Sequence, residues 1–233
     1  MHVLKLFLIS FIFLLLFWIA YCILTLPNLS GLGNKTRVPS ISVLDKKNNI
    51  IGSLGDVYGG IINRQDIPKD LLNAVIVLED KRFYTHNGVD MRGVLRALIE
   101  NIKERRYAQG ASTITQQLSK LIFLNTEKNL SRKFRELIIS FYLEYKYSKD
   151  EILLMYLNRV YLGSGLYGIK AASKRYFNKD PKNLSLEESA LLAGILKAPS
   201  RLSPLKNINA SIKRASLVIK LLLKERYISE DEQ

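Results

Sequence analysis

The sequence is poor in the residues that most often build disulfide frameworks and metal centres. Its 233 residues include one cysteine, Cys22, and two histidines, His2 and His86. One cysteine excludes an intrachain disulfide and a cysteine cluster around a metal ion. Two histidines far apart in the chain also argue against zinc, which commonly takes several histidine or cysteine ligands. We therefore expect no resident metal site.

Acidic residues are also scarce relative to basic ones. The chain carries 21 Asp and Glu against 35 Lys and Arg, a formal net charge of +14. Such an excess predicts an anionic partner: a nucleic acid, an anionic membrane surface or a phosphorylated substrate. Because the sequence carries no signature of a nucleic-acid-binding module, we expect no nucleic acid and favour the other two partners.

Charged residues are missing from residues 6–26, and this stretch is apolar throughout. As a helix it would be about 31 Å long, close to the ~30 Å hydrocarbon core of a bilayer. Trp18 and Tyr21 stand toward one end, where aromatic residues gather at membrane interfaces. We expect a single transmembrane anchor at 6–26, with residues 1–5 in the cytoplasm and the folded part outside it. A buried core helix is the alternative.

The rest of the chain predicts a mainly α-helical fold. A linker rich in Pro, Gly and Asn covers residues 27–40, and a folded domain follows at 41–233. Residues 41–44 and 50–54 flank a polar turn, which predicts a short β-hairpin near the start. Apolar periodicity predicts helices over about 69–78, 91–106, 131–147, 149–158, 169–177, 185–196 and 210–226.

The helix predicted over 131–147 divides into an apolar and a polar side. Its apolar stripe, which we expect to face the core, consists of Phe134, Leu137, Ile138, Phe141 and Tyr145. Glu136 and Ser140 fall on the other face, beside Arg132 and Lys133. Taken alone, that face is typical of a solvated surface with ion pairs one turn apart.

Residues 79–90 are the first candidate site. Glu79 and Asp80 directly follow the apolar run 74–78, and His86 and Gly88 come soon after. Carboxylates seldom follow a buried run unless they are paired or functional. The alternative is a plain helix end, in which Glu79 and Asp80 form surface ion pairs with the next two residues, Lys81 and Arg82.

Residues 110–120 are the second candidate site. They combine hydroxyl and amide side chains with a lysine, in the order Gly110, Ser112, Thr113, Gln116, Gln117 and Lys120. A capping box at a helix start would account for one hydroxyl and one amide. The remaining groups suit a ligand that carries sugar hydroxyls and phosphate.

Four stretches of the chain now stand in one order: Glu79-Asp80-x-x-Phe83-x-x-His86-x-Gly88-x-Asp90, Gly110-x-Ser112-Thr113-x-x-Gln116-Gln117, Arg132-Lys133-x-x-Glu136 and Lys149-x-x-Ile152-Leu153-x-x-Tyr156-Leu157-Asn158. Together they resemble the peptidoglycan glycosyltransferase domain, glycosyltransferase family 51, over about residues 27–233. That domain occurs in monofunctional transglycosylases and in the N-terminal half of class A penicillin-binding proteins. A fifth family motif is only loosely matched near Arg214, and Leu154 stands where the family commonly has Glu.

The resemblance implies a lysozyme-like helical lobe with a small membrane-associated jaw lobe. It implies polymerisation of lipid II into β-1,4 glycan strands, with inversion and release of undecaprenyl pyrophosphate. Glu79 would be the general base and Glu136 the second catalytic carboxylate. The substrate-binding residues would be Asp80, Phe83, His86, Arg96, Gly110, Ser112, Thr113, Gln116, Gln117, Lys120, Arg132, Lys133 and Asn158, with His86 and Asn158 largely structural.

The resemblance also implies partners and a location. The partners would be lipid II, the growing glycan chain, the cytoplasmic membrane and cell-wall synthesis proteins such as a separate transpeptidase. No cofactor is required, although a divalent cation such as Mg²⁺ would suit the pyrophosphate. The location would be the bacterial inner membrane, single-pass, with the catalytic domain on the periplasmic side.

Two alternative functions stay open at this point. A lysozyme-like lytic enzyme would cut the same glycan, and a catalytically silent, membrane-anchored scaffold would keep the fold without the reaction. Ser203-Pro204-Leu205-Lys206 fits the Ser-x-x-Lys spacing of transpeptidases, but no companion motif accompanies it. The chain is therefore expected to be either a monofunctional enzyme or the first part of a bifunctional one.

Overall fold

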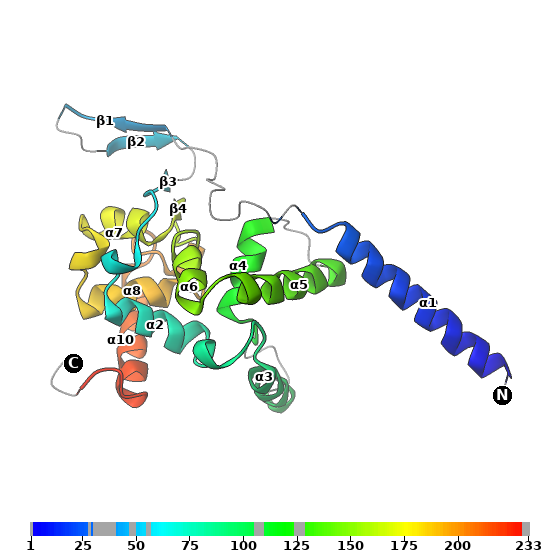
Figure 1. Cartoon of the computed structure of the whole chain (residues 1–233). Helices are drawn as coiled ribbons and strands as arrows, with labels where there is room; N and C mark the ends of the chain where they lie inside the picture. The colour runs from blue at the N-terminus through cyan, green and yellow to red at the C-terminus, as the bar shows by residue number, and fades with distance from the viewer. Residues whose placement is uncertain are drawn as a thin grey trace.

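The structure is a computed structural model, which describes residues 2–27, 29, 41–46, 50–54, 57–104, 110–123 and 129–229. Figure 1 shows a helical body from which helix α1 projects on one side and the β1–β2 hairpin on another. Most of the linker expected at residues 27–40 lies outside the described residues. The expected division into a lysozyme-like lobe and a jaw lobe stays a prediction.

Helices account for most of the described chain, as the sequence predicts. The helices are α1 (His2–Leu24), α2 (Lys69–Glu79), α3 (Met91–Lys103), α4 (Ile114–Phe123), α5 (Leu130–Lys146), α6 (Lys149–Leu157), α7 (Ile169–Phe177), α8 (Leu186–Ile195), α9 (Pro199–Leu202) and α10 (Ile208–Lys224). Short 3₁₀ turns are η2 (Arg64–Asp66), η3 (Phe83–Thr85) and η4 (Pro181–Asn183).

Helix α8 lies at the centre of the core. Every residue from Ser189 to Ile195 is buried, as expected for a segment that is covered all round, and both α2 and α10 pack against the helix. Helix α2 contributes buried side chains on most of its surface, so Glu79 stands at the end of a helix that is fixed by the core. Helices α4, α5 and α6 form a second group, in which α4 contacts the other two.

The strands form two small sheets. The predicted hairpin is confirmed: β1 (Ile41–Leu44) pairs antiparallel with β2 (Ile50–Leu54). A second pair, β3 (Val57–Tyr58) with β4 (Leu166–Tyr167), is parallel and joins distant parts of the chain. The sequence did not predict this pair, because two residues are too few to show the alternation of a strand.

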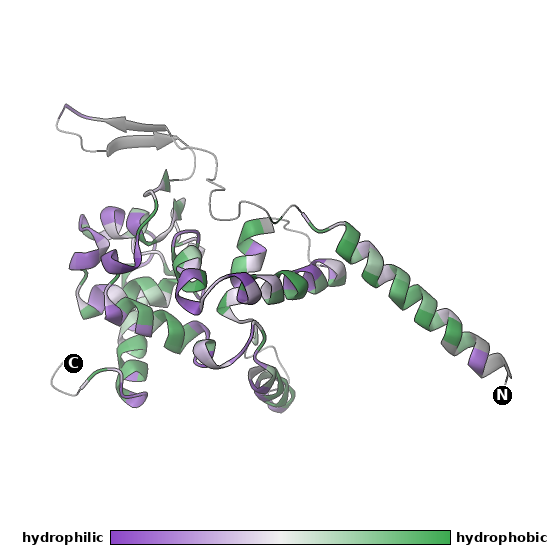
Figure 2. Cartoon of the chain, in the orientation of Figure 1, coloured by the Kyte–Doolittle hydropathy of each residue, from purple (hydrophilic) through white to green (hydrophobic). Residues whose placement is uncertain are grey.

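Helix α1 docks on the body by its C-terminal half. The indole N–H of Trp18 donates a hydrogen bond to Ser131 Oγ at 3.0 Å, and its ring lies 5.0 Å from that of Phe134. Figure 2 shows the predominantly apolar character of this helix along its length. Within the described residues, no helix has the combination of length and apolarity needed to cross a membrane. The anchor expected at 6–26 is therefore not confirmed.

The orientation of α5 differs from the prediction. The face that contains Glu136, Ile139, Ser140 and Leu143 is buried, whereas two members of the predicted stripe, Phe141 and Tyr145, are 51% and 91% exposed. The reason is polar pairing across the contact between α4 and α5, where Ser140 Oγ lies 3.0 Å from Ser119 Oγ. Buried polar groups that find partners are tolerated, so apolar periodicity alone misplaced this face.

Helix α3 presents an apolar face that the described part of the chain leaves open. Leu95, Leu98, Ile99 and Ile102 are each more than half exposed. Figure 1 shows α3 standing away from the other helices. An exposed apolar stripe of this kind marks an interaction surface rather than a core contact.

Candidate active site

A cavity of about 800 Å³ opens beside the C-terminal end of α2. The predicted site residues that line it are Glu79, Asp80, Arg96, Gly110, Ser112, Thr113 and Gln117. They come from the end of α2, from α3, and from the start of α4 together with the segment just before it. The structure thus brings the first two candidate stretches of the sequence together around one cavity.

Glu79 is half-buried and is held by an amide. Gln117 Nε2 donates a hydrogen bond to Glu79 Oε2 at 2.7 Å. The ion pairs of the plain helix-end alternative are not formed: Lys81 pairs with Glu225, and Arg82 pairs with Asp90. Glu79 is therefore not one half of a surface salt bridge, and its carboxylate faces the cavity that it lines.

The surroundings of Glu79 shift its proton affinity. Burial raises the pKa of the carboxyl above its usual value, because the charged form loses solvation. The Gln117 hydrogen bond and the nearby charges of Arg214 and Lys197 oppose this shift, while Asp80 adds to it. With a raised pKa, Glu79 accepts a proton more readily than an exposed glutamate does.

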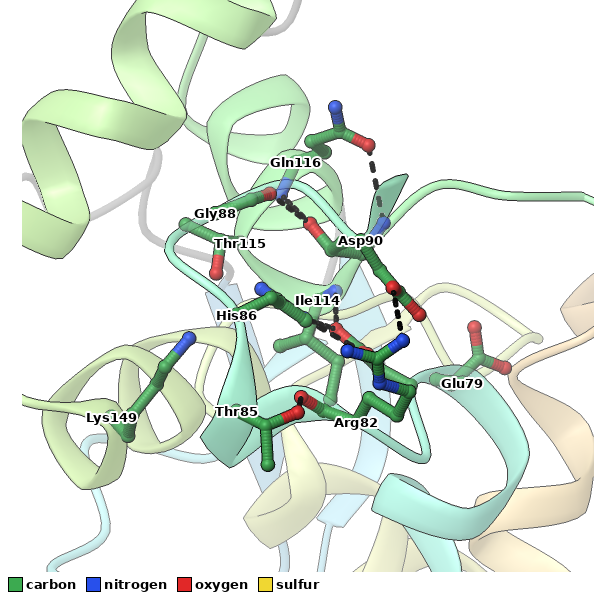
Figure 3. A network of polar contacts seen from close by, with 12 residues as sticks. Glu79, Arg82, Thr85, His86, Gly88, Asp90, Ile114, Thr115, Gln116 and Lys149 are labelled. Atoms are coloured by element: carbon green, nitrogen blue, oxygen red, sulfur yellow. Dashed lines mark hydrogen bonds and ion pairs between the residues drawn. The ribbon is translucent and has the colours of Figure 1, made fainter. Parts of the chain in front are cut away.

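Asp80 points away from solvent and joins the loop after α2 to the start of α4. His86 Nε2 lies 3.0 Å from both of its carboxylate oxygens, and the backbone N–H of Ile114 donates to Asp80 Oδ2 at 3.0 Å. Figure 3 shows His86 and Ile114 converging in this network beside Glu79. Asp80 and His86 are both buried, which suits a structural support for the site.

Gly88 is required by the same junction. Its φ is +88°, a conformation that glycine adopts without strain, and a Cβ there would lie 3.2 Å from Ser140 O. Its carbonyl oxygen accepts a hydrogen bond from Thr113 Oγ1 at 2.6 Å. Thr113 also forms the expected reciprocal cap with Gln116, since each backbone N–H donates to the other residue's side-chain oxygen.

The carboxylate of Glu144, which lies in α5, links the start of α4 to α6. Glu144 Oε1 accepts hydrogen bonds from Thr115 Oγ1 at 2.5 Å and from Lys149 Nζ at 2.8 Å. The Lys149 ammonium also lies 4.6 Å from the ring centre of Phe83. Lys149 therefore links its own motif to the first and second motifs through contacts with the structural frame.

Glu136 lines a second, smaller cavity of about 170 Å³, together with Lys120, Arg132, Arg135 and Ile139. The buried carboxylate forms ion pairs with Arg132 and with Lys133, whose Nζ is 3.3 Å from Glu136 Oε2. Lys133 Nζ also donates to Ser112 Oγ at 3.1 Å. Ser112 lines the large cavity, so Lys133 connects the surroundings of the two glutamates.

The remaining predicted residues lie in the frame rather than on a cavity wall. Phe83 is fully buried in the core, and Gln116 is buried in its cap. Asn158 bonds both the N–H and the carbonyl of Ile62, which fastens the end of α6 to the chain before α2. These contacts are structural.

Two cations of the large cavity were not singled out from the sequence. Lys197 follows directly on α8, and Arg214 lies in α10. Arg214 belongs to the stretch that only loosely matches a fifth family motif. That loose match is the sequence signal that could have identified it. Lys197 carries no local signal, because packing of α8 and α10 against α2 is what brings it near Glu79.

The side chains that could ligate a metal ion are scattered over the described part of the chain. Among the described residues, no group of three or more His, Cys, Asp or Glu side chains is placed to hold a metal ion. The polar groups that the structure does collect are carboxylates, amides, hydroxyls and cations, a set suited to sugars and phosphate.

Comparison with known proteins gives a consistent family. A family model described as "Transglycosylase" matches residues 47–223. Penicillin-binding protein 1A of Neisseria lactamica is 41% identical over 204 residues, which is 88% of this chain and 26% of that protein. The proteins of the same name from Aquifex aeolicus and Vibrio cholerae are each 38% identical over 207 residues, 89% of this chain. The chain spans about a quarter of the length of these relatives.

A solved structure was also compared. The crystal structure of penicillin-binding protein 1A from Haemophilus influenzae matches with a TM-score of 0.49 and 24% identity, over 83% of this chain and 19% of that one. At this level of similarity we infer nothing about the site.

Proposed function

The chain belongs to the transglycosylase family, and on this premise we propose that it is a peptidoglycan glycosyltransferase that polymerises lipid II. In this proposal the enzyme converts lipid II into β-1,4-linked glycan strands and releases undecaprenyl pyrophosphate. The observation that carries the proposal is the setting of Glu79, a half-buried carboxylate of raised pKa on the wall of a large polar cavity. A positioned base that accepts the proton of the acceptor hydroxyl is what the reaction requires.

The proposed reaction is a single inverting displacement. Glu79 removes the proton of the acceptor sugar's 4-hydroxyl, and the oxygen attacks the anomeric carbon of the donor. The bond from that carbon to the pyrophosphate oxygen breaks, and the leaving group departs with the electron pair. Because negative charge develops on the pyrophosphate, cations near it lower the barrier. Lys120, Arg132 and Lys133, which surround Glu136, are the proposed cations.

Glu136 has the proposed role of orienting these cations. Its buried carboxylate bonds Arg132 and Lys133 at once, so their charged ends are fixed before a ligand arrives. Preorganised charge stabilises a transition state without the cost of rearrangement. A divalent cation such as Mg²⁺, carried by the pyrophosphate itself, fits the same arrangement, and Ser112 and Gln117 are the proposed contacts to sugar or phosphate.

The proposed location is the inner membrane, with the catalytic domain on the periplasmic side. Two features support a membrane partner: the net charge of +14 and the exposed apolar face of α3. Each basic residue close to an anionic leaflet adds about 1 kcal/mol of attraction.

The test is incubation of the full chain with lipid II in detergent, followed by separation of glycan products by length. Glycan polymer in the wild type and its loss in Glu79→Gln would support the proposal. Cleavage of isolated sacculi without polymer would favour a lytic enzyme. Neither product, in detergent or in vesicles, would favour a non-catalytic scaffold.

A further inference from the structure

A tyrosine from the fourth motif reaches Glu79 through one intermediate residue. Tyr156 lies in α6 and is 1% exposed. Its hydroxyl donates a hydrogen bond to Gln117 Oε1 at 3.1 Å, and Gln117 Nε2 donates to Glu79 Oε2 at 2.7 Å. Three helices, α6, α4 and α2, thus contribute one residue each to a continuous hydrogen-bonded chain that ends on the proposed base.

The direction of this chain is fixed by chemistry. An ionised carboxylate only accepts hydrogen bonds, so Glu79 requires the NH₂ end of the Gln117 amide. The carbonyl end of the amide then faces Tyr156 and requires a donor. Burial raises the pKa of the Tyr156 phenol well above its usual value, and the negative charge of Glu79 adds to this effect. The phenol therefore keeps its proton and remains a donor throughout the neutral range.

The hydroxyl of Tyr156 has no role in filling the core. The neighbouring α6 side chains Ile152, Leu153 and Leu157 are buried apolar groups, and a phenylalanine would occupy the same space as the tyrosine ring. The oxygen is instead the end of the side chain that meets Gln117. Without that donor, the Gln117 carbonyl is left unpaired on its buried side, and the amide is held less firmly in the orientation that bonds Glu79.

We infer that Tyr156 is a positioning residue for the reaction: it holds the Gln117 amide in the one orientation that binds Glu79 Oε2 and leaves Oε1 to accept the acceptor's proton. This inference rests on the proposed function, in which Glu79 is the base. Gln117 lines the cavity and has a second N–H, so it serves the base and still faces the ligand. Tyr156 itself touches neither substrate nor the reacting atoms.

Removal of the Tyr156 hydroxyl should change both the pKa of Glu79 and the kcat of the proposed reaction. In Tyr156→Phe the Gln117 hydrogen bond, which lowers the pKa of Glu79, weakens or is lost. The pKa of Glu79 then rises, and the acidic limb of the pH–rate profile moves to higher pH. Loss of the neutral hydrogen bond between Tyr156 and Gln117 corresponds to a fall in kcat of about five- to tenfold. KM for lipid II stays close to the wild-type value, because no group that meets the substrate changes.

The experiment measures kcat and KM for lipid II from pH 5 to 9 in the full chain and in three variants: Tyr156→Phe, Gln117→Met and the double variant. If Tyr156 acts through Gln117, adding Tyr156→Phe to Gln117→Met has no further effect, whereas independent roles give losses that multiply. Tyr176→Phe is the matched control, because its hydroxyl bonds Leu162 O and Ser203 Oγ elsewhere in the fold. It is expected to keep the wild-type profile.

A carboxyl titration makes the result independent of turnover. The ¹³C resonance of Glu79, assigned by its absence in Glu79→Gln, should titrate at higher pH in Tyr156→Phe than in the wild type. An unmoved titration with an unmoved pH profile, a rise in KM alone, or multiplicative losses in the double variant would each overturn the inference. If the wild type forms no polymer, the proposed function fails, while the Glu79 titration still decides whether Tyr156 orients the amide.

Discussion

The carboxylate of Asp80 caps helix α4 from 34 residues away, with Oδ2 accepting the backbone N–H of Ile114 at 3.0 Å. Glu79 stands immediately before Asp80, and Gln117 stands one turn into α4. The same contact that satisfies a helix start therefore helps to set the distance between Glu79 and the Gln117 amide that bonds it. The two adjacent acidic residues have different surroundings: Asp80 bonds His86 and the start of α4, and Glu79 faces the cavity.

Asp80→Ala should destabilise the fold by about 3 kcal/mol, because a helix cap is lost and the buried His86 ring loses its partner. Asp80→Asn keeps an oxygen for Ile114 and should lose only about 1 kcal/mol. Urea unfolding monitored by circular dichroism separates the two. Equal stability of Asp80→Ala and the wild type would remove Asp80 from the structural role.

Glu79→Gln should abolish polymerisation without lowering the unfolding temperature. The raised pKa of Glu79 means that the folded state favours the protonated form, so the stability gained from this group is present at low pH and is lost as the pH rises through the folded pKa. At neutral pH the neutral glutamine removes that loss. Differential scanning calorimetry at pH 7.5 should give an unchanged or higher Tm, and a clearly lower one would show that the Glu79 charge supports the fold.

Glu136→Gln should reduce kcat by about a hundredfold or more, since Arg132 and Lys133 lose the carboxylate that orients them. The stability change should stay near 1 kcal/mol, because both cations retain access to solvent. Glu188→Gln is the matched control: it removes a lysine pair, with Lys179, away from the two cavities, and should leave kcat unchanged. A rise in KM with normal kcat would instead make Glu136 a group for binding in the ground state.

Trp18→Ala should loosen the docking of α1. The variant loses the ring contact with Phe134 and the hydrogen bond to Ser131 Oγ, together worth about 1–2 kcal/mol. Hydrogen exchange should accelerate in the first turns of α5, which carry Ser131 and Phe134. Trp18→Phe keeps a ring and should show a smaller effect, as should Ser131→Ala. Unchanged exchange in Trp18→Ala would mean that α1 and α5 are not coupled.

Short sequence patterns predicted the secondary structure more completely than they predicted the surroundings of the candidate site. The hairpin and the helices from Pro68 onward, except α4 and α9, follow from local patterns of polar and apolar residues, and the Thr113–Gln116 cap follows from a four-residue pattern. The buried face of α5 did not follow, because Glu136 and Ser140 are buried through partners on other elements. Lys197 likewise reaches the neighbourhood of Glu79 through tertiary packing, which no short stretch of sequence encodes.

The apolar face of α3 gives the last prediction. Leu95, Leu98, Ile99 and Ile102 expose a stripe that costs free energy in water, and Arg92 and Arg96 on the same helix suit anionic headgroups. If this face lies in the membrane interface, a fluorophore on Ile99→Cys, in a Cys22→Ser background, should be quenched by nitroxide-labelled lipids after reconstitution of the full chain. The same label on Leu205→Cys, which is 57% exposed against 54% for Ile99 but lies beyond α9, should be quenched far less. Equal quenching at both positions would show that α3 has no preferred contact with lipid. In that case we would expect a protein partner for the stripe, because contiguous exposed apolar patches mark interaction sites.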